Sequence, residues 1–215
     1  MLDIPCYTTT DLVAQRLLPL GWKAQISAAV SSFSAAAVLR GGRSTSLEEP
    51  GSDIPYRLMD GSAIRQHLPW LDDLYRTHLV ALGTMAAGIP VVASDSIKSG
   101  INLNVLDGPG GRYELHTDSN PLTGLLFVTT HQPGDGGQLM FTKEGQERTL
   151  MPRAGTFITF DARSVPHKVT PLSIQTTRIS APMNFYFEGM CERPSDLDDY
   201  LYGGGEPPRT TSKED

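Results

Sequence analysis

Hydrophobic and polar residues alternate along the second half of the chain, beginning at residue 101. Ile101, Leu103 and Val105 alternate with Asn102 and Asn104, and a period of two residues predicts a β-strand with two different faces. Further runs of strand composition, separated by short turns rich in Gly or Pro, cover residues 112–118, 123–130, 138–142, 156–161, 167–170 and 177–187. The pattern predicts a compact antiparallel barrel at about 97–188.

The first half of the chain favours helices that pack against this barrel. In residues 62–87 the leucines at 71, 74, 79 and 82 recur near helical spacing, and Pro69 suits the first turn of a helix. Residues 79–93 are expected to be a buried helix that leads into a strand. The fold class is therefore α+β, mainly β, with N-terminal packing helices.

Three other N-terminal segments are less clearly patterned. Thr9, Thr10 and Asp11 can cap a helix through Leu18. The Ala/Ser-rich residues 22–39 fit a helix or a strand. Residues 40–53 gather Gly, Ser, Glu and Pro, which predicts either a plain surface loop or a lid that orders over a substrate. Loop-length statistics favour the plain loop.

Composition indicates one domain and argues against several classes of partner. The chain has 215 residues, of which 39% are hydrophobic and 20% charged, enough for one core and one pocket. We expect a single domain over 1–202, including a short acidic helix at 195–202, and a disordered polar tail at 203–215. A net charge of −6 disfavours a nucleic-acid partner. The oligomeric state is not predicted.

The N-terminus, the most apolar segment and the cysteines indicate the cellular compartment in which the protein is expected. The N-terminus has no basic region followed by an apolar run, which predicts a cytoplasmic protein without a signal peptide. The most apolar segment, residues 79–93, is too short for a bilayer span and is interrupted by Gly88 and Pro90, so no membrane association is expected. Cys6 and Cys191 are expected to be reduced bystanders rather than a disulfide.

Candidate chemistry is concentrated in the predicted barrel. In an extended strand His116 and Asp118 share a face, and His167 follows about fifty residues later, after several strands. Two imidazoles and one carboxylate form a facial triad that holds Fe(II) and leaves coordination positions open. Arg178 suits a bidentate grip on a carboxylate, with the Ser180 hydroxyl on the same strand face. The other histidines, His67, His78 and His131, are expected to be ordinary surface or packing residues.

These residues stand within longer motifs. The run Gly110-Gly111-Arg112-Tyr113-Glu114-Leu115-His116-Thr117-Asp118 resembles the G-G-x-Y-x-x-H-x-D run of prolyl-hydroxylase-like Fe(II)- and 2-oxoglutarate-dependent dioxygenases. The run Gly136-Gly137-Gln138-Leu139-Met140-Phe141 resembles their G-G-x-L-x-F strand, and residues 155–160 resemble the strand before the distal His. Arg178-x-Ser180 is similar to the penicillin-synthase-like branch. The resemblance covers roughly residues 100–187.

The resemblance implies a double-stranded β-helix, with His116, Asp118 and His167 as catalytic iron ligands. It implies Fe(II), 2-oxoglutarate and O2 as cofactors and cosubstrates, with Arg178 and Ser180 holding the distal carboxylate of 2-oxoglutarate. Both branches usually place a tyrosine about ten residues before the first His, where this chain has Leu106 and Asp107. Tyr113 or Asn104 can supply the missing hydrogen bond, and Tyr113 fits a packed barrel residue equally well.

The implied reaction hydroxylates or desaturates a small molecule, such as an amino acid or biosynthetic intermediate, and releases succinate and CO2. The expected substrate lining is Asn102, Arg163, Met183 and Tyr186, with Asn104 beside them. A peptidyl prolyl hydroxylase of the same superfamily is the alternative. Two further alternatives assign the chain to other functional classes. One is a non-catalytic, cupin-like protein that binds metal and 2-oxoglutarate, and the other is a zinc-dependent hydrolase.

Overall fold

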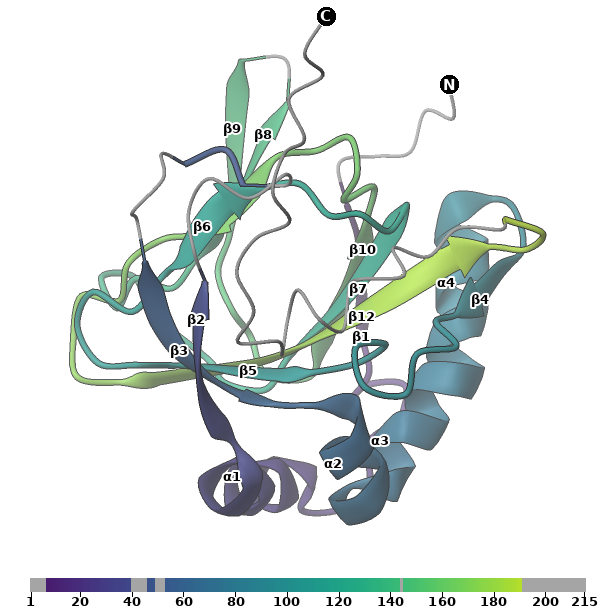
Figure 1. The fold of residues 1–215 in the computed structure, drawn as a ribbon, viewed down its shortest axis with the longest axis horizontal. Coiled ribbons are helices and arrows are strands. Elements are labelled where there is room, and N and C mark those ends of the chain that lie inside the picture. Colours follow the sequence, from purple (N-terminus) through teal and green to yellow (C-terminus); the bar gives the residue numbers. More distant parts are fainter. Residues whose placement is uncertain (1–6, 40–45, 49–52, 144, 191–215) are drawn as a thin grey trace, which may run out of the picture.

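Two antiparallel β-sheets face one another and form the barrel of Figure 1. The computed structural model describes residues 7–39, 46–48, 53–143 and 145–190. The larger sheet has eight strands. Its order is β1 (Thr8–Asp11), β10 (Thr156–Phe160), β7 (Leu122–Phe127), β12 (Thr177–Phe187), β5 (Leu103–Asp107), β3 (Ile54–Met59) and β2 (Ala35–Leu39), and β4 (Val91–Ala93) also pairs with β12.

The smaller sheet has the order β6 (Tyr113–His116), β11 (His167–Val169), β8 (Leu139–Lys143) and β9 (Gln146–Leu150). Every strand pair in both sheets is antiparallel. The predicted double-stranded β-helix is thereby confirmed. The six predicted runs from residue 112 on all contain strands of the barrel, and residues 177–187 match β12 at both ends.

The larger sheet has two buried faces, which we call inner and outer. The inner face meets the smaller sheet, and residues such as Leu58, Leu106 and Phe127 pack there with Phe141 and Val169 of the smaller sheet. The outer face packs against the helices through residues such as Val105, Ile179 and Met183. Because side chains alternate along a strand, Arg178 and Ser180 point to the inner face while Ile179 and Met183 point to the outer one.

The helices lie along the outer face of the larger sheet (Figure 1). They are α1 (Trp22–Phe33), α2 (Gly61–His67), α3 (Pro69–Leu74), the π-helix η1 (Tyr75–Leu79) and α4 (Val80–Ala87). The helical prediction for 62–87 is confirmed, with an interruption at Leu68 before Pro69 opens α3. Asp60 caps α2 by accepting a hydrogen bond from the Ala63 amide at 2.9 Å. Residues 22–39 are divided between helix α1 and strand β2.

One helix prediction was wrong. The segment from Thr9 to Leu18 begins as strand β1, which pairs with β10, and then turns. Asp11 does act as a cap, because its Oδ1 accepts from the amides of Val13 and Ala14 at 3.0 Å, but the capped turn does not extend into a helix. Leu12 is fully buried in the outer core, so pairing and burial outweigh the local capping signal.

Two further strands were not predicted, β9 and β3, and only β9 lacks a period-two signal, since Ile54, Tyr56 and Leu58 of β3 alternate with more exposed residues. Strand β9 is mostly exposed, with the pattern eeeei from Gln146 to Leu150, and becomes a strand through its hairpin with β8. Strand β3 follows directly on the predicted loop and pairs with both β2 and β5. Pairing between segments distant in sequence is a tertiary property that a local pattern does not report.

The predicted loop at 40–53 is described only at 46–48 and 53. There, Ser46 forms a β-bridge with His116, and the Leu47 amide donates to the carbonyl of Leu115 at 2.8 Å. This short segment therefore lies along β6. The choice between loop and lid stays untested. The expected acidic helix, the tail and both cysteines lie outside the described residues. No helix in the described ranges has the length and apolar character of a membrane span.

Candidate metal centre and anion site

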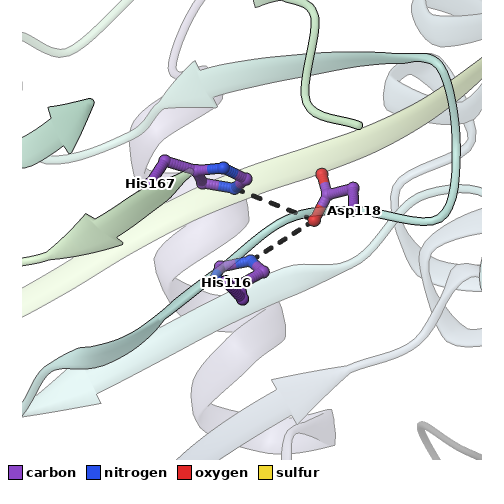
Figure 2. A group of neighbouring side chains, drawn as sticks. All are labelled: His116, Asp118 and His167. Atoms are coloured by element: carbon purple, nitrogen blue, oxygen red, sulfur yellow. Dashed lines mark ion pairs between the residues drawn. The ribbon is translucent and has the colours of Figure 1, made fainter. Parts of the chain in front are cut away.

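Two histidines stand directly opposite one another in the smaller sheet. His167 of β11 pairs in register with His116 of β6, and their ring centroids are 4.2 Å apart. Asp118 completes the group (Figure 2): its Oδ1 lies 3.3 Å from Nε2 of His116 and 3.7 Å from Nε2 of His167. The three candidate ligand atoms all lie within 4.8 Å of one another. The site thus brings together the three residues predicted as metal ligands.

Asp118 reaches the site by a different route from the one predicted. Strand β6 ends at His116, so the two side chains are not held on one face of a continuous strand. The Asp118 amide instead donates to the carbonyl of Ala162 at 2.8 Å, which anchors the segment after β6 to the opposite side of the barrel. Thr123 of β7 donates its hydroxyl hydrogen bond to Asp118 Oδ2, and Asn120 Nδ2 donates to Thr123 Oγ1 at 2.8 Å.

Backbone carbonyls orient both imidazoles. Nδ1 of His116 lies 2.8 Å from the carbonyl oxygen of Glu114, and Nδ1 of His167 lies 3.0 Å from that of Val165. These contacts assign the proton to Nδ1 in each ring, because a carbonyl can only accept. In the neutral form of each ring, the unprotonated Nε2 would therefore face Asp118. Metal-binding histidines are commonly held by such a hydrogen bond from the second ring nitrogen.

Electrostatics keeps the carboxylate ionised. Burial alone would raise the pKa of Asp118, but the neighbouring His167 and His116 hold that pKa at about 2. Burial, followed by repulsion from His116, lowers the pKa of His167 to about 4. For His116 burial acts to lower the pKa, and the hydrogen bond and charge of Asp118 raise it overall. An ionised carboxylate and neutral imidazole nitrogens are the forms that bind a divalent metal.

Arg178 is a buried cation on the inner face of β12. Only 2% of its surface is exposed, and burial lowers its pKa to about 10. Its Nε donates to the carbonyl of Gly137 at 2.9 Å, and its Nη1 donates to Ser180 Oγ at 2.9 Å. Its Nη2 is buried and has no hydrogen-bond partner, and within the described ranges no carboxylate forms an ion pair with it. A buried cation without a counter-ion favours an anionic ligand.

The two candidates for the missing tyrosine occupy different places. Asn104 of β5 pairs in register with Ser180, so its side chain lies on the same inner face as Arg178. Its Oδ1 is buried and has no hydrogen-bond partner in the described structure. Tyr113 belongs to the smaller sheet, and its ring packs 5.1 Å from that of His116 and edge-on to that of Tyr56 at 5.9 Å. The geometry favours Asn104 as the residue beside Arg178.

The predicted substrate residues divide between the two faces. Asn102 shares the inner face with Asn104 and is 8% exposed. Arg163 donates through Nε and Nη2 to the carbonyl of Ser119, the residue after Asp118, at 3.3 and 2.8 Å. Met183 does not line the inner space. It is fully buried in the outer core, because an odd-numbered residue of β12 points toward the helices.

Tyr186 is a buried residue of β12 on the face that carries Arg178. Its side chain is 4% exposed, and its hydroxyl has no hydrogen-bond partner in the described structure. Burial raises the pKa of this hydroxyl, the Arg163 charge opposes that rise, and the Asp118 charge adds to it. The phenol is therefore a protonated donor in the neighbourhood of Asp118.

The sequence argument treated His131 as an ordinary surface or packing residue, and the structure shows it buried. It is 3% exposed and lies beside the Gly136-Gly137 turn that holds Arg178. The one available signal was its position just before that glycine-rich turn. The other two histidines match their expectation: the ring of His67 stacks on Phe33 at 3.6 Å, and His78 is exposed.

Residues 101–186, which include both the triad and Arg178, match the sequence model of the 2OG-Fe(II) oxygenase superfamily. This part of the chain is therefore similar to that superfamily. The comparison with curated proteins found no significant match to the chain. Solved structures with a similar fold share few residues with the chain.

The chain resembles the α-ketoglutarate-dependent epimerase SnoN from nogalamycin biosynthesis, with a TM-score of 0.64 and 16% identity over 95% of this chain and 86% of that one. It also resembles a Trichoplax adhaerens prolyl hydroxylase in complex with a peptide fragment of the hypoxia-inducible factor, with a TM-score of 0.63 and 15% identity over 87% and 86%. A Pseudomonas putida prolyl-4-hydroxylase aligns at 0.53 and 19% over 87% and 96%. At these identities the likeness concerns the fold.

Proposed function

We propose that the protein is an Fe(II)- and 2-oxoglutarate-dependent dioxygenase that hydroxylates or desaturates a small molecule. The observation that carries this proposal is the pairing of two sites in one barrel. The ligand atoms of His116, Asp118 and His167 lie within 4.8 Å of one another, and Arg178 is a buried cation whose Nη2 has no hydrogen-bond partner among the described residues. The first site suits a divalent metal and the second a carboxylate, and 2-oxoglutarate has groups for both.

The donor set fits iron(II). Two imidazole nitrogens and one carboxylate oxygen from one side of the site form the facial arrangement typical of non-haem iron oxygenases. His116 and His167 would bind through Nε2 and Asp118 through Oδ1, the atoms that face one another in Figure 2. With iron bound, the centre supplies dioxygen activation coupled to the oxidative decarboxylation of 2-oxoglutarate to succinate and CO2.

The remaining residues bind and orient. Arg178 Nη2 would donate to the distal carboxylate of 2-oxoglutarate, while Ser180 and Asn104 complete that end of the site. Thr123 keeps Asp118 in its binding orientation. Because Asp118 occupies the third ligand position, hydroxylation or desaturation is favoured over halogenation, which uses a small residue there in related enzymes.

A small substrate would bind on the inner face between the metal site and the far end of β12. The Tyr186 hydroxyl is a protonated donor without a partner in the described structure, and Asn102 adds an amide on the same side of the larger sheet. Arg163, anchored on the Ser119 carbonyl, adds a positive charge near Asp118. Such a lining suits a polar substrate that presents hydrogen-bond acceptors, such as an amino acid or a biosynthetic intermediate.

A peptidyl prolyl hydroxylase is the alternative within the class. It is favoured by the Gly110–Asp118 motif and by the likeness in fold to a prolyl hydroxylase that binds a peptide. Succinate release measured against a panel of free amino acids and against proline-containing peptides distinguishes the two. Turnover with peptides alone would transfer the proposal to the peptidyl class.

The central test is the visible charge-transfer absorption of an Fe(II)–2-oxoglutarate chelate, measured without oxygen. The wild-type protein should develop the band, His167→Ala should abolish it, and Arg178→Ala should demand a higher 2-oxoglutarate concentration. His78→Ala is the matched control, since His78 is an exposed histidine distant from the site in sequence. A folded wild-type protein without the band contradicts the proposal. Zinc-supported hydrolysis would then favour a hydrolase, and a band without succinate release for any substrate would favour a non-catalytic binding protein.

A further inference from the structure

His131 is a buried histidine outside the triad, and it lies against the arginine site. A Cβ atom added to Gly137 would come 3.1 Å from Nδ1 of His131 and 3.2 Å from Cδ of Arg178. Gly137 also has a φ of +72°, which favours glycine. The imidazole and the arginine side chain therefore approach the same glycine, whose carbonyl accepts the Arg178 Nε hydrogen bond.

The hydrogen bonds of His131 flank that contact. Nδ1 lies 3.3 Å from the carbonyl oxygen of Gly136, so it donates, and Nε2 lies 3.5 Å from Oγ1 of Thr129. Thr129 Oγ1 in turn accepts from the Ile179 amide at 3.1 Å. The chain of contacts thus runs from the residue before Gly137 to the residue after Arg178, and it connects the glycine-rich turn to β12.

A neutral imidazole satisfies this chain. Nδ1–H donates to the carbonyl, and unprotonated Nε2 can accept from the Thr129 hydroxyl, which also lies 3.5 Å from the Ile179 carbonyl oxygen as an alternative acceptor. Burial is the largest effect and lowers the pKa of His131. The backbone hydrogen bonds to Gly136 and Thr177 and the Asp135 charge oppose this shift, and the Arg178 charge adds to it. The lowered pKa favours a neutral imidazole beside the buried Arg178.

We propose that His131 is a positioning residue for the cosubstrate site. By holding the Gly136-Gly137 turn against β12, it fixes the Gly137 carbonyl, which orients Arg178 so that Nη2 faces the distal carboxylate of the bound dicarboxylate. The identity of that ligand as 2-oxoglutarate rests on the proposed function above. Loss of the His131 contacts releases the turn, and the guanidinium then loses its orientation, although no atom of His131 touches the ligand.

The test uses two keto acids on the Fe(II)-loaded protein under anaerobic conditions. Both 2-oxoglutarate and pyruvate carry an α-keto acid group for the metal, but only 2-oxoglutarate also has a distal carboxylate for Arg178. Dissociation constants are measured by titration of the visible band and by calorimetry. In His131→Phe, which keeps the ring and loses the hydrogen bonds, the affinity for 2-oxoglutarate should fall about tenfold while that for pyruvate stays unchanged.

His131→Asn supplies the conservative rescue, because its amide can replace the Nδ1 donor to Gly136. It should bind 2-oxoglutarate within about threefold of wild type. If His131→Phe does not fold, His131→Ala against His131→Asn makes the same comparison. The proposal is overturned if His131→Phe binds 2-oxoglutarate as tightly as wild type, or if it loses as much affinity for pyruvate as for 2-oxoglutarate. It is also overturned if His131→Asn loses as much 2-oxoglutarate affinity as His131→Phe. A wild-type protein that binds neither keto acid overturns the proposed function itself.

Discussion

His116 and His167 are cross-strand partners: they are in register between β6 and β11, with ring centroids 4.2 Å apart. Each ring is also tied to the backbone of its own chain segment through Nδ1, His116 to Glu114 and His167 to Val165. The pair is therefore arranged by the sheet itself before any metal binds. Asp118, in contrast, is held by contacts outside the strand pairing. Those contacts should therefore determine how tightly the site binds a metal.

Substitutions of Asp118 and of Thr123, which donates a hydrogen bond to it, should weaken metal binding to different degrees. Asp118→Gly removes a ligand and should abolish stoichiometric Fe(II) binding and turnover. Thr123→Val removes the hydroxyl that donates to Asp118 Oδ2 and should lower metal affinity about 10- to 100-fold, as is typical of an outer hydrogen bond. Calorimetric titration of the metal-free protein measures both. Full activity in Asp118→Gly would show that the ligand assignment is wrong.

Asn104 should determine 2-oxoglutarate affinity without affecting the metal. Asn104→Leu removes the amide across from Ser180 and should lower 2-oxoglutarate affinity about tenfold, the value of one buried hydrogen bond to a charged group. Asn104→Asp should lower it further, because the added carboxylate would repel the ligand and pair with Arg178. Tyr113→Phe is the matched comparison. A larger loss in Tyr113→Phe than in Asn104→Leu would assign the role to Tyr113.

Tyr186→Phe should separate stability from function. A buried hydroxyl without a partner contributes no hydrogen-bond energy, so its removal should leave the free energy of unfolding unchanged or raise it by up to about 1 kcal/mol. Turnover should fall through a higher KM if the hydroxyl binds substrate. Denaturant unfolding and steady-state succinate release measure the two effects. Marked destabilisation with unchanged kinetics would indicate a structural role instead.

The Glu48–Arg112 ion pair should make the stability depend on pH. Nη1 and Nη2 of Arg112 donate to the two carboxylate oxygens of Glu48, and the Leu115 amide donates to Glu48 Oε1 at 3.0 Å. The Arg112 hydrogen bond is the main cause that holds the Glu48 pKa below 4.5. Because the folded-state pKa is depressed, the stabilisation is complete above 4.5 and disappears as pH falls through the folded value.

Glu48→Gln should therefore lower the free energy of unfolding by about 1 kcal/mol at neutral pH, a modest value for a partly exposed pair. The difference from wild type should shrink below pH 4.5 and vanish at lower pH. Urea unfolding of both proteins across this pH range measures it. A difference that persists unchanged at low pH would show that the ion pair is not its source.

Much of the barrel could be predicted because its strands carry local information. Strand β12 alternates between inner and outer residues along its whole length, and this period identified both its extent and the shared face of Arg178 and Ser180. Where local and tertiary preferences disagree, prediction failed. Asp11 caps a turn as its residue type favours, yet the segment is a strand because β10 supplies a partner.

The sequence by itself determined the residue types of the site, their order and the period that places them on strands. Few types of side chain bind a metal or a carboxylate, and these residue types can be recognised directly in the sequence. Only the tertiary structure decided that Met183 faces the helices, that Asn104 lies across from Ser180 and that His131 is buried beside Gly137. Those facts depend on strand register and on contacts between segments distant in the chain, which pairing and burial select together.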